Sequence, residues 1–196
     1  MELGDIKAQL KHYTDSFKYN EADLAFNILD FWQWNQSDLI ENRNRGILAE
    51  FLVMKGLDLK SETRLEWDAY DFKTENGLKI EVKSASYIQA WRQKKLSSIS
   101  FNIKKTKALL EDNNYANSPE RQADIYILCL LHHKDQTTIN PMDLKQWRFY
   151  LVTKTVLDKE LLDQKTLSLS TLKLLPHKSC DFYGLKSCFK ELTKNF

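Results

Sequence analysis

A predicted β-hairpin between residues 64 and 91 constrains the fold of this chain more than any other stretch. Its turn signal is Glu75-Asn76-Gly77, and Asn-Gly tolerates the positive φ angles that tight hairpin turns require. After the turn, apolar and charged residues alternate in the run LKIEVK, residues 78–83. Because side chains alternate faces along a strand, Glu81 and Lys83 must share one face, opposite to the apolar residues. Such charges are rarely buried without partners, so the functional hypothesis begins with them.

Length and composition favour one domain. The 196 residues, about 42% hydrophobic and 12% aromatic, can bury one sizeable core, and the 5 Gly and 3 Pro form no linker. We therefore expect a single domain over residues 1–196. Its parts are expected to be amino-terminal helices over 1–40, a core over about 41–155 and a carboxy-terminal extension over about 156–196.

Charge and cysteine content bound the location of the chain but not its partner. The formal net charge of +2 is too small to indicate nucleic-acid binding by itself. The odd set Cys129, Cys180 and Cys188 contains no CxxC and is typical of free thiols in a reducing cytoplasm. No signal peptide begins the sequence, and no stretch approaches about 18 uninterrupted apolar residues. We expect a soluble, cytoplasmic protein with no membrane contact.

Apolar spacing predicts helices before the hairpin. Residues from Ile6 to about Asn35 are expected to form two helices, or one helix broken near Tyr19, with aromatic side chains used for packing. A further helical pattern begins at Ser37 and is expected to end at Gly56. Glu50 interrupts its apolar part. This residue is either a solvated flank or a carboxylate directed into a site.

After the hairpin the pattern predicts alternating strands and helices. The continuous apolar run 123–131 is expected to be a central strand covered on both faces. The adjacent His132 and His133 point to opposite faces of a strand, so we do not expect a metal site there. Further predicted elements are a strand or arm at 98–103, a helix from 105 to about 113, a strand at 147–152, and helices at 155–162 and 186–196.

Residues 83–107 contain seven basic residues and no acidic residue. Cations displace the counterions of a phosphate backbone, and aromatic side chains can stack on bases. This basic strip therefore predicts contact with nucleic acid, and the alternative is a solvated lysine-rich face. The candidate nucleic-acid-binding residues of the strip are Trp91, Arg92, Lys94, Lys95, Lys104 and Lys105.

The region from Arg45 to about Trp91 resembles the active-site pattern of the PD-(D/E)XK nuclease superfamily, which includes restriction endonucleases and Holliday-junction resolvases. The resemblance rests on a helical Glu50, on Asp68 or Asp71 before the turn, and on the following Glu-x-Lys motif. No proline precedes either aspartate, which departs from the name motif. The resemblance implies an α/β fold with a restriction endonuclease-like core, in which helices flank a central mixed sheet of four to five strands.

The resemblance also implies roles for the site residues. Asp71 and Glu81 would bind Mg²⁺, with Mn²⁺ as a substitute, Val82 would contribute its carbonyl oxygen, and Lys83 would act on the attacking water. Glu50 would support a second metal or its water shell. Hard Mg²⁺ prefers carboxylate and water oxygens, and a bound ion polarises a phosphoryl oxygen and lowers the pKa of water.

Two further polar residues follow the Glu-x-Lys motif. Some relatives carry a polar residue near the site at this point, so Ser84 and Gln89 are candidate contacts to nucleic acid. The alternatives are a helix-capping serine and a surface glutamine.

The length of the hairpin loop decides which aspartate faces the metal. Directly paired residues share a face, so an odd-length loop such as residues 75–77 sets Asp71 opposite Glu81. A loop of two or four residues would instead place Asp68 on that face. We favour Asp71 and keep both as candidates.

The sequence thus predicts a Mg²⁺-dependent nuclease, endo- or exonucleolytic, whose substrate is DNA. A nuclease that cuts both strands commonly dimerises, so a second copy is a candidate partner. Two alternatives stay open. One is a nuclease-fold protein without turnover that serves as a nucleic-acid- or protein-binding module. The other is an α/β interaction protein whose charged hairpin is a solvated sheet edge.

Overall fold

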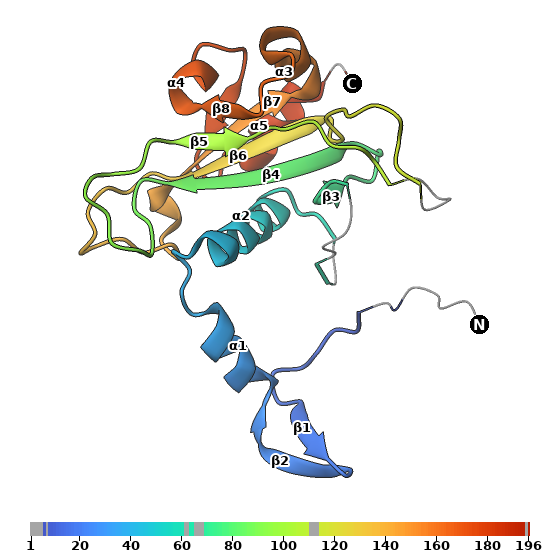
Figure 1. Ribbon diagram of the computed structural model, residues 1–196, viewed down its shortest axis with the longest axis vertical. Coiled ribbons are helices and arrows are strands. Elements are labelled where there is room, and N and C mark those ends of the chain that lie inside the picture. The colour runs from blue at the N-terminus through green and yellow to red at the C-terminus, as the bar shows by residue number, and fades with distance from the viewer. Residues whose placement is uncertain (1–5, 7, 61–62, 65–68, 110–113, 195) are drawn as a thin grey trace.

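A mixed five-stranded sheet forms the centre of the computed structural model, which describes residues 6, 8–60, 63–64, 69–109, 114–194 and 196 (Figure 1). The strand order is β3-β4-β6-β7-β9, in which β4 and β6 are parallel and the other neighbours antiparallel. This confirms the predicted α/β class and the central mixed sheet. The strands are β3 (Phe72–Lys73), β4 (Lys79–Ser86), β6 (Ile125–Leu131), β7 (Trp147–Thr153) and β9 (Lys178–Cys180).

The β3–β4 hairpin has a three-residue loop. Phe72 pairs with Ile80, and the backbone N–H of Thr74 donates to the carbonyl of Leu78 at 2.9 Å. Gly77 has a φ of 89°, which residues with a side chain rarely adopt. The pairing ends at Phe72, and the backbone N–H of Asp71 donates to the carbonyl of Ile80 at 2.9 Å. The odd-length alternative of the loop is therefore the one that the structure contains.

Each face of the sheet carries its own layer. One face packs under α2 (Asn42–Gly56) and α5 (Leu185–Leu192), with Val53 against Ile80 and Val82 in one apolar cluster. The other face is covered by the β5–β8 pair and two helices, whose apolar side chains join those of β6 and β7. These elements are β5 (Ser100–Asn102), β8 (Thr166–Ser168), α3 (Lys154–Leu161) and α4 (Leu169–Leu172).

Most of the predicted core elements are confirmed. Every residue of β6 is buried, as expected of a continuous apolar run between two layers. The helix with Glu50 ends at Gly56 as expected, but it begins at Asn42, because Glu41 accepts hydrogen bonds from the first backbone N–H groups. None of the helices in the described ranges combines the length and apolar character needed to cross a membrane.

The predicted helix from residue 105 to about 113 is wrong in its described part. Thr106 and Leu109 form antiparallel bridges to Glu120 and Tyr115, so the chain is extended at these positions. Thr106 and Glu120 exchange both backbone hydrogen bonds, at 2.9 and 3.0 Å. This pairing between two segments of the same chain replaces the local helical hydrogen bonds on which the prediction relied. Residues 110–113 lie outside the described part.

The prediction of helices over residues 6–35 is largely wrong. This segment contains the hairpin β1 (Ser16–Tyr19) and β2 (Ala22–Asn27), followed by α1 (Ile28–Gln36). Asn20 and Glu21 have φ values of 49° and 67°, the two positive angles of a tight hairpin turn. The helix starts only after Asn27, which forms a capping box with Asp30. Together residues 8–36 form an amino-terminal arm that extends away from the sheet (Figure 1).

Candidate active site

Strand β4 presents the charged pair predicted from its alternation. Ile80 and Val82 are buried in the cluster under α2, whereas Glu81 and Lys83 point to the opposite face. The side chains of Glu81 and Lys83 are 19% and 32% exposed, and the ammonium group donates to the carboxylate. They line a cavity of about 160 Å³. The other lining residues are Ala69, Asn102, Ile103, Lys104, Thr106, Gln122 and Tyr126.

Asp71 directly precedes β3 in the chain and lies beside β4. Its Oδ2 accepts a hydrogen bond from the backbone N–H of Val82 at 2.6 Å. Burial, and then the nearby carboxylates of Glu81 and Glu50, raise the pKa of Asp71 to about 7, although the Val82 bond and Lys83 oppose this shift. Asp71 therefore interacts electrostatically with both other carboxylates of the candidate site.

Glu50 is a held carboxylate rather than a solvated flank. Its side chain is 14% exposed. Arg64 donates to both carboxylate oxygens, with its Nε 2.5 Å from Oε2 and a terminal nitrogen 3.0 Å from Oε1. Such a fork matches carboxylate geometry and fixes the side chain. The interpretation from sequence overlooked Arg64, because nothing in its local pattern distinguishes it from a surface arginine.

The donors around Asp71 suit a hard divalent cation. Carboxylates from Glu50, Asp71 and Glu81, with the carbonyl of Val82, are the oxygen ligands that Mg²⁺ prefers. In the described part of the chain, however, no three His, Cys, Asp or Glu side chains converge on one metal position. Glu50 lies on α2, whereas Glu81 points to the face of the sheet opposite that helix, and the two carboxylates are paired with Arg64 and Lys83, respectively. Asp68 lies outside the described residues.

The predicted nucleic-acid contacts are spread over several places. Lys104 lines the cavity with Glu81 and Lys83, whereas Lys94 and Lys95 line a separate cavity of about 210 Å³. Trp91 and Arg92 are exposed, and Lys105 pairs with Asp163 at 2.9 Å.

The two polar residues after the Glu-x-Lys motif are less accessible. Ser84 is half-buried on β4. Gln89 is only 9% exposed, and its side chain accepts from Arg45 at 3.2 Å and donates to the Ser86 carbonyl at 2.8 Å. These contacts leave little of the Gln89 amide for DNA.

Tyr126 is a site residue that sequence reasoning missed. In the parallel β4–β6 register it is the partner of Glu81, and it lines the same cavity. Burial and then Glu81 raise the pKa of its hydroxyl above the usual range, so it remains a neutral donor. Tyr126 lies within an apolar run, and only the register of two distant strands places it beside the carboxylate.

A comparison with protein families supplies independent evidence. A model described as bacteriophage T4 endonuclease IV matches residues 1–171. The chain belongs to the bacteriophage T4 endonuclease IV family. The matched range contains Glu50, Asp71, Glu81 and Lys83. No curated protein matches the chain. Membership of the T4 endonuclease IV family supports a nuclease enzyme, and the PD-(D/E)XK pattern remains a resemblance.

Proposed function

We propose that this protein is a divalent-metal-dependent nuclease that hydrolyses DNA phosphodiester bonds at the Glu50, Asp71, Glu81 and Lys83 site. The observation that carries the proposal is the position of Asp71. It is half-buried beside the β3–β4 hairpin, where its carboxylate accepts from the N–H of Val82, and repulsion from Glu81 and Glu50 helps to raise its pKa to about 7. A site that concentrates negative charge in this way favours a cation. The endonuclease family match supports DNA as the substrate.

Asp71 and Glu81 are the proposed metal ligands, together with the carbonyl of Val82. A bound Mg²⁺ ion would polarise the scissile phosphoryl group and lower the pKa of the attacking water. Lys83 would release Glu81, orient that water and offset the negative charge that develops on the phosphate. Glu50 would support the water shell from the α2 side. Tyr126 would donate a hydrogen bond beside Glu81 without losing its proton.

The order of the elements supports assignment of the site to the PD-(D/E)XK superfamily. A glutamate on α2 precedes a hairpin with an aspartate and a Glu-x-Lys strand, and β6 then pairs parallel to that strand. We further propose a cytoplasmic enzyme, because Cys129 and Cys180 are buried free thiols and Cys188 is also free. A homodimer is part of the proposal, since a nuclease that cuts both strands commonly dimerises.

A second candidate function is a nucleic-acid-binding module without turnover. The observation that favours it is the pair of ion pairs Glu50–Arg64 and Glu81–Lys83, which neutralise two of the three carboxylates. In this alternative the basic residues bind DNA and the hairpin is only structural. The ordinary interaction protein is disfavoured, because Asp71 senses both other carboxylates.

Cleavage assays separate the two candidates. Wild-type protein is incubated with single-stranded, double-stranded and branched DNA in Mg²⁺, in Mn²⁺ or in EDTA, and Lys83→Ala protein purified in the same way is assayed in parallel. Metal-dependent cleavage that Lys83→Ala lacks supports the nuclease. If the wild-type protein binds DNA but cleaves every substrate no faster than Lys83→Ala does, the binding module is supported instead.

A further inference from the structure

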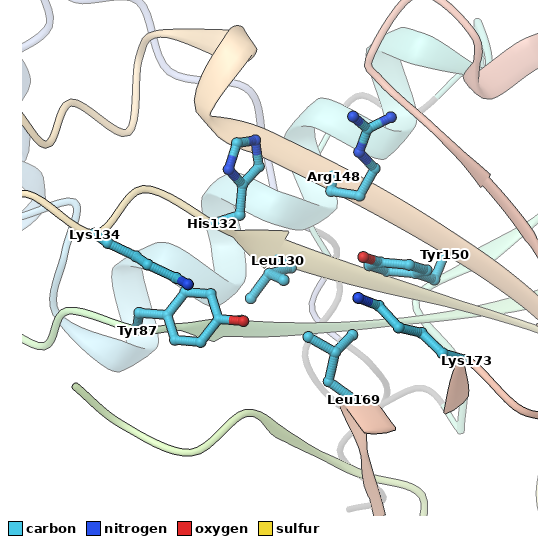
Figure 2. A pocket seen from close by; sticks show the side chains of 8 residues that line it. All are labelled: Tyr87, Leu130, His132, Lys134, Arg148, Tyr150, Leu169 and Lys173. Atoms are coloured by element: carbon cyan, nitrogen blue, oxygen red, sulfur yellow. The ribbon is translucent and has the colours of Figure 1, made fainter. Parts of the chain in front are cut away.

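A second cavity lies beyond the carboxyl end of β4 and is rich in cations (Figure 2). It has a volume of about 240 Å³, and Lys134, Arg148 and Lys173 line it with Tyr87 and Tyr150. Figure 2 shows the hydroxyl groups of both tyrosines and the ammonium group of Lys173 directed into the same space. No acidic residue lines this cavity within the described part of the chain.

The three cations of this cavity have no close acidic partner in the described ranges, although Arg148 also lines another cavity with Asp143 and Asp181. None of them forms an ion pair with an acidic residue of the described ranges. Lys134 instead lies over the ring of Tyr87, with its nitrogen 4.8 Å from the ring centre. Like charges at close range repel one another, and an anion that binds between them removes this repulsion. The cavity therefore has the charge and donors of an anion site.

Lys134 also lines the neighbouring cavity that holds Lys94 and Lys95. The shared lysine joins the two cavities into one cationic track of Lys94, Lys95, Lys134, Arg148 and Lys173. Neither cavity has an acidic residue among its described lining. The track contacts a chain of anions better than it contacts a single small ion, because its charges are distributed along a surface.

The track lies on the same side of the sheet as the candidate active site. Side chains alternate along the strand, so Tyr87, four residues after Lys83, faces the Glu81 and Lys83 side. Four residues of extended chain span roughly 13 Å. A DNA strand whose cleaved bond lies at Lys83 would therefore have phosphates several nucleotides away at the track.

We propose that the cationic track binds backbone phosphates of a single DNA strand, several nucleotides from the bond that the active site cleaves. Arg148, Lys173 and Lys134 contact the phosphates, and the tyrosine hydroxyls donate further hydrogen bonds. The statement that the track lies several nucleotides from the cleaved bond rests on the proposed nuclease function. The phosphate site itself does not.

The test measures binding without divalent metal, so that no cleavage is involved. A fluorescein-labelled 12-nucleotide single strand is titrated in EDTA at several KCl concentrations, and its anisotropy gives Kd. An Arg148→Gln/Lys173→Gln double variant is compared with Lys190→Gln/Lys194→Gln, which removes two exposed lysines of the carboxy-terminal region. Both variants change the net charge by the same amount.

The track variant is expected to bind at least ten times more weakly than wild type. Each lost phosphate contact lowers the slope of log affinity against log salt by about 0.7, so two contacts lower it by about 1.4. The control keeps the wild-type slope. Equal losses in both variants, or an unchanged slope in the track variant, would overturn the proposal. Weaker binding by the track variant with no wild-type cleavage would retain the track and reject the nuclease.

The amino-terminal arm supports a second inference from different observations. Its described residues include seven exposed aromatic side chains, and none of the residues of α1 is buried. A two-stranded hairpin and a nine-residue helix are marginally stable in water without a packing partner. The exposed aromatic residues are Tyr13, Phe17, Tyr19, Phe26, Phe31, Trp32 and Trp34.

Buried polar side chains fix the arm away from its own core. Asn44 is buried and its amide donates to the carbonyls of Asn35 and Asp38, at 3.2 and 3.0 Å. Arg45, also buried, donates to the carbonyl of Ile40 at 2.8 Å. This elbow holds the arm in the direction seen in Figure 1. The partner that covers the arm must therefore come from outside the chain.

Charge indicates what this partner is. The arm, residues 8–36, contains four acidic and two basic residues, whereas residues 42–196 contain nineteen acidic and twenty-six basic residues. The acidic arm disfavours DNA and complements the basic core of another copy. The seven aromatic residues are between 37% and 82% exposed. They offer roughly 700 Å², close to the ~800 Å² per partner of a standard interface. We infer that the arm packs against the core of a second copy of this chain.

The oligomeric state of the full chain tests this inference. Light scattering coupled to gel filtration should give twice the 23.1 kDa mass of one chain. A Phe26→Ser/Trp34→Ser variant should shift to the single-chain mass. Trp91→Ser, which removes an exposed aromatic residue of the core, should remain a dimer. A wild-type protein that keeps the single-chain mass at every concentration up to its solubility limit would overturn the inference.

Discussion

The active-site cavity and the cationic track lie on one side of the same sheet, yet their charges are organised in opposite ways. In the first, Glu81 is paired with Lys83, and Glu81 helps to raise the pKa of the half-buried Asp71. In the second, Lys134, Arg148 and Lys173 gather without an acidic partner in the described part. One cavity therefore suits a cation, and the other suits phosphate.

The largest expected effect is on cleavage. Glu81→Gln should reduce the rate constant for DNA hydrolysis by about 10²–10³-fold, because it removes a proposed metal ligand and the partner of Lys83. The rate is measured at saturating DNA and Mg²⁺. Lys79→Gln, on the same strand, is the matched control and should retain most activity. Equal losses in both variants would show that the division between the cavities is wrong.

The next effect is on how the free energy of unfolding depends on pH. The pKa of Asp71 is about 7 in the folded chain, against an ordinary value of 3.8. The folded state then binds the proton more tightly, so this contribution to stability is fully present below the ordinary pKa and is lost as pH rises through the folded value.

Asp71→Asn removes this dependence on pH. Relative to wild type, the variant should gain roughly 2 kcal/mol in the free energy of unfolding between about pH 5 and pH 8 without metal. Urea denaturation at both pH values measures the difference. A constant difference between the two proteins would mean that Asp71 titrates normally and does not sense its carboxylate neighbours.

A smaller effect is expected at the track. Arg148→Gln/Lys173→Gln should raise KM for single-stranded DNA about tenfold and leave kcat unchanged, since the track binds the ground state and the transition state equally. Steady-state kinetics at fixed Mg²⁺ provide both constants. A loss confined to kcat would assign these residues to the chemical step, and the track would then not be a separate phosphate-binding surface.

The smallest effect concerns the hairpin that positions Asp71. Gly77→Ala should destabilise the fold by about 1 kcal/mol, because alanine is strained at a φ of 89°. Gly46→Ala is the matched control. Its added Cβ meets nothing within 4 Å, so the helix should gain about 0.5–1 kcal/mol. Thermal melts of both variants measure these changes, and a stable Gly77→Ala would indicate that the turn tolerates another geometry.

The hairpin and the core strands could be predicted from sequence because their determinants are local. The Asn-Gly turn, the alternation after it and the apolar run of β6 each specify an element without distant partners. The prediction for the amino-terminal arm was wrong because it also relied on a local pattern. Its aromatic spacing fits a helix, and only the positive φ angles at Asn20 and Glu21 reveal the turn.

The functional surfaces were predictable only in part. Glu81 and Lys83 follow from alternation within one strand. The partners that define their environment do not, because Tyr126 and Arg64 reach the site through long-range packing. The cationic track unites residues from distant segments, and Lys173 comes from the end of a short helix. No local pattern places these side chains together.

Anomalous diffraction from a crystal soaked in Mn²⁺ would test the metal site most directly. We predict an anomalous peak within coordination distance of carboxylate oxygens of both Asp71 and Glu81, with the Lys83 ammonium moved away from Glu81. An intact Glu81–Lys83 pair with no peak beside Asp71 would contradict it.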